Sequence, residues 1–373
     1  MREGWTETTL GDVAETSWGN TSVTKSKYRD YGHTAFSASG PDGLIDWFEH
    51  EGKGVVLSAI GALCGKTWLA DGKWTPIKNT IWLKSNSGEN LDVYLYLLTQ
   101  LPNIWPIRGQ AQPFISLGDV RLVEVVLPPL AEQKRIVDVV SSVDTYISAL
   151  QQQANAARTA RNAVLHELLS AGGDDWSETT LGDVAVLNPK ESALSADSPF
   201  IPMDAVHVGK RYIQYLEPRG DRNGARANTG DVLFARITPC LENGKVAQIQ
   251  SGIERCGGST EFIVIRGTNM FDSDFAYFWA TWSETRNHAA GLMTGTTGRQ
   301  RLSASDLGAM TVSLPPLVEQ KRIVEIVSSM DDVIQSTEQA VADAKNLRSG
   351  VLSDLLSGEH EIPASYDVFV GAA

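Results

Sequence analysis

Two segments of this 373-residue chain occur twice, in the same order. The first is W-T-E-T-T-L-G-D-V-A at Trp5 to Ala14, which recurs as W-S-E-T-T-L-G-D-V-A at Trp176 to Ala185. The second is L-P-P-L-A-E-Q-K-R-I-V at Leu127 to Val137, which recurs as L-P-P-L-V-E-Q-K-R-I-V at Leu314 to Val324. Self-similarity of this kind indicates that the same structural units are used twice. The chain is therefore predicted to alternate between a domain and a connector.

The connector after each L-P-P-L segment is predicted to be a long helix. No Pro or Gly occurs between Ala131 and Ser170, and the second copy contains only Gly350. Proline just before the first turn and glycine just past the end favour helix boundaries, and Gly172 and Gly358 stand at the expected ends. A helix of about 40 residues spans about 60 Å.

Steps of four and three along each helix select an apolar seam that is typical of a coiled coil. The second seam repeats the first at a constant offset of 187 residues. We therefore expect two antiparallel coiled-coil helices related by an internal pseudo-twofold axis. The seam positions are Ile136, Val140, Val143, Ile147, Leu150, Ala154, Ala157, Arg161, Val164 and Leu168 in the first helix, and Ile323, Val327, Met330, Ile334, Thr337, Val341, Ala344, Arg348, Val351 and Leu355 in the second.

One arginine occupies the same step of each seam, Arg161 in the first helix and Arg348 in the second. Each side chain could lay its stem along the seam and keep its guanidinium in water. Alternatively, each could pair with a carboxylate of the other helix and fix the register. The sequence leaves both interpretations open.

The stretches between the repeats are predicted to be mostly β, because they contain short apolar or alternating runs bounded by Gly, Asn or Pro. The expected strands are Gly54–Ile60, Ile77–Leu83, Arg121–Leu127, Asp231–Ile237 and Phe262–Ile265, and the expected small helices are Asp92–Leu98 and Phe275–Trp282. The predicted fold class is therefore α+β, with two mostly-β domains joined by two long helices. The expected boundaries are 1–126 for the first domain, 127–172 for the central helical repeat, 173–313 for the second domain, 314–360 for the C-terminal helical repeat and 361–373 for a tail.

The composition and motifs give no sign of a catalytic or metal centre. Three cysteines form no disulfide framework, and six scattered histidines have no metal-ligand spacing. We find no phosphate-binding loop, no adenine-methylation motif and no nucleophile elbow. No apolar run approaches the roughly 20 residues of a membrane span, and no secretory leader opens the sequence, so a cytoplasmic location is expected.

The net charge of -13 argues against a protein that holds nucleic acid by bulk attraction. Locally the balance differs, because five basic residues and two acidic ones lie between Lys210 and Arg226. An acidic chain with basic patches fits a protein that contacts DNA on one face and other subunits elsewhere.

The repeated blocks closely resemble the specificity subunits of type I restriction-modification systems, in which recognition domain and helical repeat alternate twice. Further marks of the resemblance are G-Q-A-Q-P-F-I-S at Gly109 to Ser116, G-S-T-E-F-I-V at Gly258 to Val264 and G-T-T-G-R-Q-R-L-S at Gly295 to Ser303. The resemblance implies a non-catalytic subunit whose two domains each read half of a split double-stranded DNA site. It also implies that the helices set the spacer and dock two methyltransferase subunits and usually restriction subunits. S-adenosylmethionine, ATP and Mg are then expected on the partner subunits.

Candidate DNA-binding residues are expected in the variable loops, because Arg reads guanine, Gln reads adenine and Lys holds phosphate. The leading candidate is the loop from Gly295 to Arg301, since its glycines permit close backbone approach to phosphate. A solvated surface charge is the alternative for each residue. The candidates are Lys25, Lys27, Tyr28, Arg29, Lys66, Arg108, Gln110 and Gln112 in the first domain, and Lys210, Arg211, Tyr212, Arg219, Arg222, Arg226, Arg236, Lys245, Arg299, Gln300 and Arg301 in the second.

The helix starts carry a repeated polar triplet that self-packing alone does not demand, and partner docking is a plausible reason, although recent duplication would also explain it. The triplet is Gln133, Lys134 and Arg135 in the first copy and Gln320, Lys321 and Arg322 in the second. The tail from Glu359 to Ala373 has no counterpart after the first helix. Rival functions are a DNA-reading subunit of another phage-defence complex, a coiled-coil interaction scaffold that does not read DNA, and an enzyme with its own reading domain.

Overall fold

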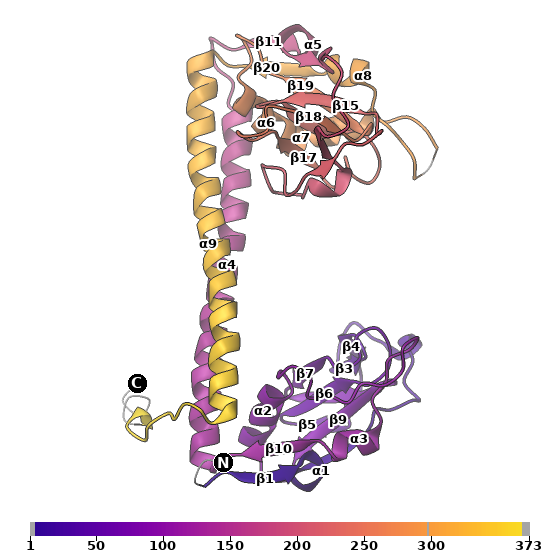
Figure 1. Ribbon diagram of the computed structural model, residues 1–373, viewed down its shortest axis with the longest axis vertical. Helices are drawn as coiled ribbons and strands as arrows, with labels where there is room; N and C mark the ends of the chain where they lie inside the picture. The colour runs from indigo at the N-terminus through magenta and orange to yellow at the C-terminus, as the bar shows by residue number, and fades with distance from the viewer. Residues whose placement is uncertain (1–3, 297, 368–373) are drawn as a thin grey trace. The chain divides into compact units, whose positions relative to one another are not determined.

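The structure, a computed structural model, describes residues 4–296 and 298–367. It divides into two compact units by its internal contacts. Unit 1 consists of residues 1–150 and 340–373, and unit 2 consists of residues 151–339. The division cuts through both long helices, so each unit combines one globular domain with a part of each helix (Figure 1).

Domain 1, in unit 1, is closed by an antiparallel pair of its first and last strands, β1 and β10. Between them lie two four-stranded sheets, ordered β2-β9-β6-β7 and β4-β3-β8-β5. The elements are β1 (Thr6–Thr9), α1 (Leu10–Val13), β2 (Ala14–Trp18), η1 (Lys25–Lys27), β3 (His33–Ser37), β4 (Gly40–Ile45), β5 (His50–Glu51), β6 (Gly54–Ser58), β7 (Thr67–Ala70), β8 (Lys73–Pro76), β9 (Thr80–Ser85), α2 (Glu89–Leu98), α3 (Leu117–Arg121) and β10 (Glu124–Leu127).

Domain 2, in unit 2, repeats this plan. Its first and last strands, β11 and β20, also pair antiparallel, and its two sheets are ordered β12-β19-β16-β17 and β14-β13-β18-β15. In both domains the second sheet contains one parallel pair, β3 with β8 and β13 with β18. The elements are β11 (Ser177–Thr180), α5 (Leu181–Val184), β12 (Val186–Leu187), β13 (Pro199–Ile201), η2 (Met203–Ala205), β14 (Glu217–Pro218), β15 (Ala225–Asn228), β16 (Val232–Ala235), β17 (Val246–Gln248), β18 (Arg255–Gly258), β19 (Phe262–Arg266), α6 (Ser273–Thr281), α7 (Ser283–Gly291), α8 (Ala304–Gly308) and β20 (Thr311–Leu314).

The expected strands and small helices are present, with ends that differ from the prediction by up to three residues, and two strands begin three residues late. Strand β10 begins at Glu124 instead of Arg121, because the Ser116 side chain caps helix α3, which runs through Arg121. Strand β9 begins at Thr80 instead of Ile77, because a turn that contains Asn79 at φ 69° precedes it. Both differences arise where a local turn or cap competes with apolar alternation.

Helices α4 (Leu130–Ser170) and α9 (Leu317–Ser357) are both 41 residues long. Each helix start is held by a buried glutamine of the repeated triplet. The Gln133 amide donates to the Pro128 carbonyl at 2.8 Å, and the Gln320 amide donates to the Pro315 carbonyl at the same distance. The helix ends are followed by Gly172 and Gly358 in the left-handed region, at φ 63° and 74°, as helix-terminating glycines are.

All twenty seam residues are buried or half-buried. In unit 1, Ile136 and Leu355 belong to the core of domain 1, and in unit 2, Leu165 and Ile323 belong to the core of domain 2. The helices therefore complete the hydrophobic core of each domain, and a helix without its domain would expose an apolar face.

The two seam arginines pair with carboxylates of the other helix, so the carboxylate interpretation holds. In unit 2, Arg161 forks onto Asp331, with Nε 2.8 Å from Oδ1. In unit 1, Arg348 forks onto Asp144, with Nη2 2.9 Å from Oδ2. The guanidiniums are not left in water, because only 11% of the Arg161 side chain and 18% of the Arg348 side chain are exposed. The two pairs are related by the same 187-residue offset as the seams.

Among the described residues, no helix has the length and apolar character that crossing a bilayer demands. The three cysteines are free thiols.

Candidate nucleic-acid interface

Two loops occupy equivalent positions in the two domains, and we call them loop 1 (108–114) and loop 2 (294–301). Loop 1 is closed by a β-bridge between Arg108 and Phe114, and loop 2 by a bridge between Thr294 and Arg301. Phe114 also bridges to Ile60, and Arg301 to Ile237. Residue 297, within loop 2, lies outside the described residues. Both loops thus leave equivalent bridges of the scaffold.

A serine two residues after each loop continues the equivalence. The Ser116 hydroxyl accepts a hydrogen bond from the Asp119 amide at 3.0 Å, and the Ser303 hydroxyl accepts one from Asp306 at 3.0 Å. These bonds cap helices α3 and α8. The serine that ends each loop motif is therefore a feature of the shared scaffold.

The glycine that opens each loop is required by the loop's own closure. Gly109 and Gly295 have φ of 81° and 130°, and an added Cβ would lie 2.6 Å from the Gln112 carbonyl oxygen and 2.9 Å from that of Arg299. Gly298 differs, because a Cβ there would meet nothing within 4 Å. Close approach of an external phosphate, as predicted from the glycines, is therefore sterically open at Gly298.

The loop tips carry groups suited to reading bases. Gln110 and Gln112 in loop 1 and Arg299 in loop 2 are exposed. Gln300 is half-buried, and its backbone amide donates to the Thr238 hydroxyl at 3.1 Å. Amide and guanidinium side chains present the donor and acceptor pairs that match adenine and guanine edges.

A charged cluster forms the base of loop 2. Arg301 donates through Nε and Nη2 to the Glu261 carboxylate, with Nη2 2.7 Å from Oε1. The hydrogen bonds from Arg301 lower the pKa of Glu261. Arg236 lies alongside, since its backbone amide donates to the Glu261 carbonyl at 2.9 Å, and its Nε is buried without a hydrogen-bond partner among the described residues. The structure thus brings three predicted residues, Arg236, Gln300 and Arg301, to one place.

Sequence reasoning missed Glu261, although it lies in the quoted G-S-T-E-F-I-V motif. A carboxylate directly before a buried strand was the available signal. At the base of loop 1, Arg108 instead donates through Nη2 to Asp119 at 2.6 Å.

The basic run from Lys210 to Arg226 divides into two groups with internal partners. In the first group, Lys210 pairs with Glu338 of α9, which also pairs with Arg158 of α4 at 2.5 Å. Arg211 contacts Asp274 at 2.6 Å and the Ser328 hydroxyl of α9 at 3.3 Å. These two residues fasten domain 2 to the helices within unit 2, while the neighbouring Tyr212 is 46% exposed.

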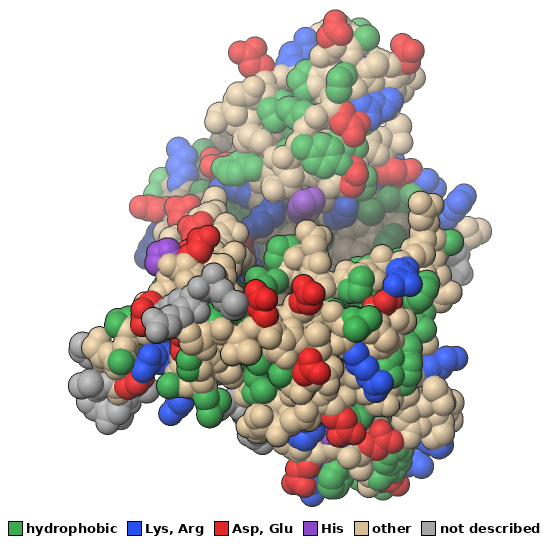
Figure 2. All heavy atoms as spheres, turned by 60° about the horizontal axis from the view of Figure 1, so that its bottom comes forward, with side chains coloured by type: hydrophobic (Ala, Val, Ile, Leu, Met, Phe, Trp, Pro, Cys, Tyr) green, Lys and Arg blue, Asp and Glu red, His purple; other side chains and the backbone are tan. Residues whose placement is uncertain are grey.

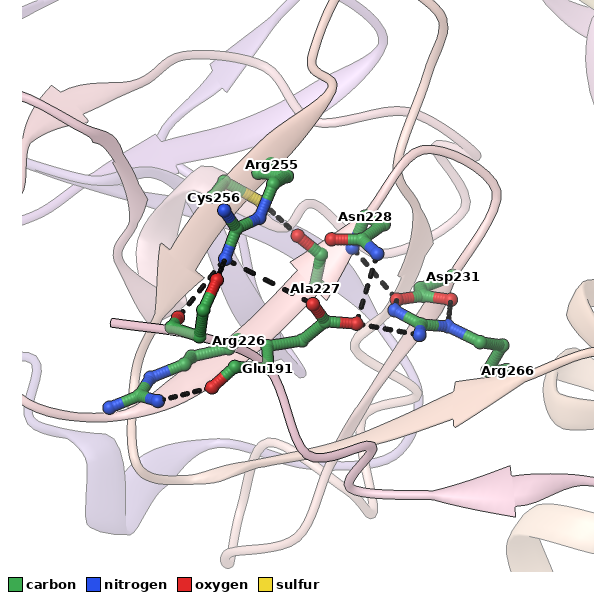
Figure 3. A network of polar contacts seen from close by, with 9 residues as sticks. Glu191, Arg226, Ala227, Asn228, Asp231, Arg255, Cys256 and Arg266 are labelled. Carbon is green, nitrogen blue, oxygen red and sulfur yellow. Dashed lines mark hydrogen bonds and ion pairs between the residues drawn. The ribbon is translucent and has the colours of Figure 1, made fainter. Parts of the chain in front are cut away.

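In the second group, the arginines hold the irregular segment 191–194 against sheet β14-β13-β18-β15. Arg226 donates to the Glu191 carbonyl at 2.6 Å and Arg219 to the Leu194 carbonyl at 3.3 Å. Arg255, which the sequence did not single out, donates to the Ser192 hydroxyl at 2.7 Å (Figure 3). Many of the N–H groups of these arginines are therefore bonded to the chain itself.

The same network reaches a buried carboxylate. Arg266 forks onto Asp231, which is 2% exposed, and donates through Nη1 to Glu191 at 2.6 Å (Figure 3). The hydrogen bond from Arg266 lowers the pKa of Glu191. Arg222 lies 3.9 Å from the centre of the Phe200 ring and pairs with Glu217 at 2.5 Å. For Arg219, Arg222 and Arg226, contact with DNA stays a prediction.

The remaining candidates are dispersed. Lys25, Lys27 and Arg29 are exposed near η1, and the Tyr28 hydroxyl donates to Asp42 at 3.0 Å. Burial and Asp42 raise the pKa of Tyr28 to about 12. Lys66 lies 5.7 Å above the Trp68 ring, and Lys245 donates to the Met203 carbonyl at 2.9 Å.

The helix-start triplets are not uniformly accessible. Gln133 and Gln320 are 6% and 0% exposed, so their side chains contact the chain itself. Both glutamines hold a helix start in this structure, and partner docking by them stays a prediction. Lys134, Lys321 and Arg322 are exposed, and for them docking stays a prediction.

Charge is mixed over the surface. On the face drawn in Figure 2, acidic and basic side chains are interspersed. Any contact with DNA therefore depends on the placement of individual side chains more than on a uniform positive field.

Comparison with known proteins shows that this architecture matches a known protein family. The family model described as the type I restriction modification DNA specificity domain matches residues 2–157 and again residues 173–344. The chain belongs to this family. The duplicate match coincides with the repeat that the sequence shows.

Among curated relatives, the EcoKI type I restriction enzyme specificity subunit of Escherichia coli K12 is 24% identical over 64% of this chain and 58% of its own length. The MjaVIII specificity subunit of Methanocaldococcus jannaschii is 21% identical over 72% of this chain and 70% of its own length. The alignment thus spans less than two thirds of the EcoKI subunit.

Two solved structures share the fold over nearly the whole chain. The S subunit of the type I restriction-modification system from M. genitalium superposes with a TM-score of 0.58 at 15% identity, covering 94% of this chain and 96% of that one. A chain from a study of complex assembly and conformational transition of the type I system superposes with a TM-score of 0.59 at 18% identity, covering 95% and 98%.

Proposed function

We propose that this chain is the non-catalytic specificity subunit of a type I restriction-modification complex, in which each domain reads one half of a bipartite DNA site. The observation that carries the proposal is the pair of loops 1 and 2, which leave equivalent bridges of a shared scaffold but present different side chains. Family membership supplies the class of ligand, double-stranded DNA.

In this proposal the two loops read different letters. Gln110 and Gln112 of loop 1 present amides, which pair with adenine in the major groove. Loop 2 presents Arg299 and Arg301, and guanidinium groups pair with guanine. The fork on Glu261 uses two of the five N–H groups of Arg301, which leaves three for a base or phosphate.

The long helices form an antiparallel coiled coil with pseudo-twofold symmetry and set the spacer between the half-sites. Support comes from the covered seams and from the two inter-helix ion pairs, which the repeat relates to one another. Inserting four residues after Ala160 adds about 6 Å of helix, which corresponds to about 1 to 2 bp of DNA. The same two half-sites with a longer spacer are expected by long-read methylation mapping, whereas an unchanged spacer with full activity would show that the helices do not measure the DNA.

The partners in this proposal are two methyltransferase subunits per chain and, in the complete enzyme, restriction subunits. S-adenosylmethionine, ATP and Mg bind on those subunits, and catalysis takes place there. A cytoplasmic location stays a prediction of the sequence.

The test is loop-specific mutagenesis in the assembled complex. Arg301→Ala should weaken binding to the second half-site by about 1 to 3 kcal/mol and leave the first half-site unchanged, measured with DNA duplexes mutated in one half at a time. Gln112→Ala in loop 1 is the matched variant and should affect only the first half-site. An equal loss of affinity for unrelated DNA would mean that the residue contacts only phosphate. Base reading by that residue would then have no support.

A further inference from the structure

The C-terminal tail is seated on the start of α4 in unit 1. Arg135 donates through Nε and Nη2 to the two carboxylate oxygens of Asp367, at 2.9 and 2.8 Å, and through Nη1 to the Ile362 carbonyl at 3.3 Å. Ile362 is 8% exposed and belongs to the core of domain 1, and Tyr366 packs against that core. The tail therefore covers Arg135 of the first repeated triplet with a carboxylate, and its apolar anchor Ile362 lies in the core of domain 1.

Among the described residues, none covers the arginine of the second triplet in this way. Arg322, the repeat counterpart of Arg135, has a side chain that is 71% exposed, and its ion-pair partner Glu319 is 3.8 Å away on its own helix. Val318, four residues earlier on the same helix face, is 83% exposed, and Lys321 is exposed as well. We call Val318, Lys321 and Arg322 the second docking surface, and Ala131, Lys134 and Arg135 the first docking surface.

The contact between the tail and Arg135 shows that a guanidinium at this repeat position can bind a carboxylate. A planar guanidinium and a carboxylate form two parallel charge-assisted hydrogen bonds, which fix both position and orientation. The two helix starts share the sequence E-Q-K-R-I-V, so the second docking surface presents the same guanidinium and ammonium groups. An exposed valine beside two cations is suited to a segment that carries both a carboxylate and an apolar side chain.

We propose that the second docking surface binds a carboxylate-bearing segment of a methyltransferase subunit, and that the C-terminal tail holds the first docking surface in the same manner until a partner displaces it. This inference rests on the proposed function, because that function supplies the methyltransferase as the partner. The two methyltransferase sites are then unequal. The site at Arg322 binds directly, and the site at Arg135 binds more weakly because the tail must first be released.

The test is a titration of the full-length chain with its cognate methyltransferase subunit, followed by calorimetry and native mass spectrometry. The wild-type chain is expected to show two binding events of different affinity. Arg322→Ala should weaken the tighter event by roughly tenfold, since it removes a charge-assisted hydrogen bond. Asp367→Ala should strengthen the weaker event severalfold, because the tail no longer competes for Arg135.

The matched control is Glu359→Gln, an exposed tail carboxylate that is not bonded to Arg135 through its side chain, and it should leave both events unchanged. Asp367 is 56% exposed, so the urea midpoint should confirm that its variant remains folded. Unchanged affinities in Arg322→Ala or in Asp367→Ala would overturn the inference while the proposed function stands. Self-association of the chain that Arg322→Ala abolishes would overturn it too, by assigning the surface to the tail of a second copy. Failure of the wild-type chain to bind any methyltransferase would instead reject the proposed function.

Discussion

Domains 1 and 2 have the same strand plan but opposite chemistry at the base of their loops. In domain 1 the equivalent backbone positions carry Ala59, which is fully buried, and Phe114, which is 41% exposed. In domain 2 they carry Arg236 and Arg301, which gather around Glu261. The closing bridge, the left-handed glycine and the serine cap are common to both. The comparison teaches that the scaffold positions a loop, and that a few exchangeable side chains decide what the loop contacts.

The domains also differ in how they are fastened to the helices. In unit 2, Lys210 and Arg211 reach from a loop of domain 2 to α9, and the guanidinium groups of Arg161 and Arg211 each lie 5.3 Å from the centre of the Phe278 ring. In unit 1, the Trp5 ring N–H donates to Glu132 at the start of α4 at 3.1 Å, and the tail holds Arg135 nearby on the same helix. Basic residues in a loop can therefore attach the domain to the long helices in one domain and have no such role in the other.

The largest expected effect tests this attachment. Phe278→Ala should destabilise unit 2 by about 3 to 5 kcal/mol, because a fully buried ring is lost. Arg161 and Arg211 also lose the ring that both of them contact. Hydrogen exchange measured by mass spectrometry should show increased exchange in domain 2 and in the adjoining helix halves. Increased exchange of equal size throughout domain 1 would mean that the two units do not unfold separately and would break the comparison.

A smaller difference is expected between the two seam arginines. Arg161→Ala should cost about 2 kcal/mol in urea unfolding, because its guanidinium is nearly covered and its removal leaves Asp331 without its fork. Arg348→Ala should cost about 1 kcal/mol, since Asp144 is 47% exposed and water can replace the arginine. A larger loss of stability in Arg348→Ala than in Arg161→Ala would indicate that the contact of Arg161 with the Phe278 ring contributes nothing to stability.

The smallest effect is a dependence on pH. The hydrogen bonds from Arg266 and Arg301 lower the pKa of Glu191 and of Glu261, both in unit 2. Carboxylates of this kind stabilise the folded state above the ordinary glutamate pKa of about 4.3, and the contribution is lost as the pH falls through the folded-state pKa. Glu261→Gln should therefore flatten the fall of the urea midpoint on acidification. An acid dependence in Glu261→Gln equal to that of the wild-type chain would contradict this cause.

The repeat allowed much of the fold to be predicted, because duplicated segments, apolar periodicity and Pro or Gly boundaries are local signals. The starts of β9 and β10 were misplaced where a turn and a serine cap overrode alternation. The site was harder to predict, because a basic residue in a loop has the same sequence signature whether it faces DNA or its own chain. Arg211 and Arg226 are bonded to residues 274 and 191, respectively, and such distant partners are visible only after folding. The burial of Gln133 and Gln320 was likewise hidden, since their identical repetition suggested an exposed surface.

The most direct test of the central claim, that each domain reads its own half-site independently of its place in the chain, is a chimaera with two copies of domain 2. Residues 177–314 would replace residues 6–127, which begin and end at the same strands of the repeated scaffold. Long-read methylation mapping of cells that contain the chimaera and the partner subunits should reveal a symmetric site, made of two inverted copies of the second half-site. A folded and assembled chimaera that still methylates the original bipartite site, or one that reads new letters in either half, would contradict the account.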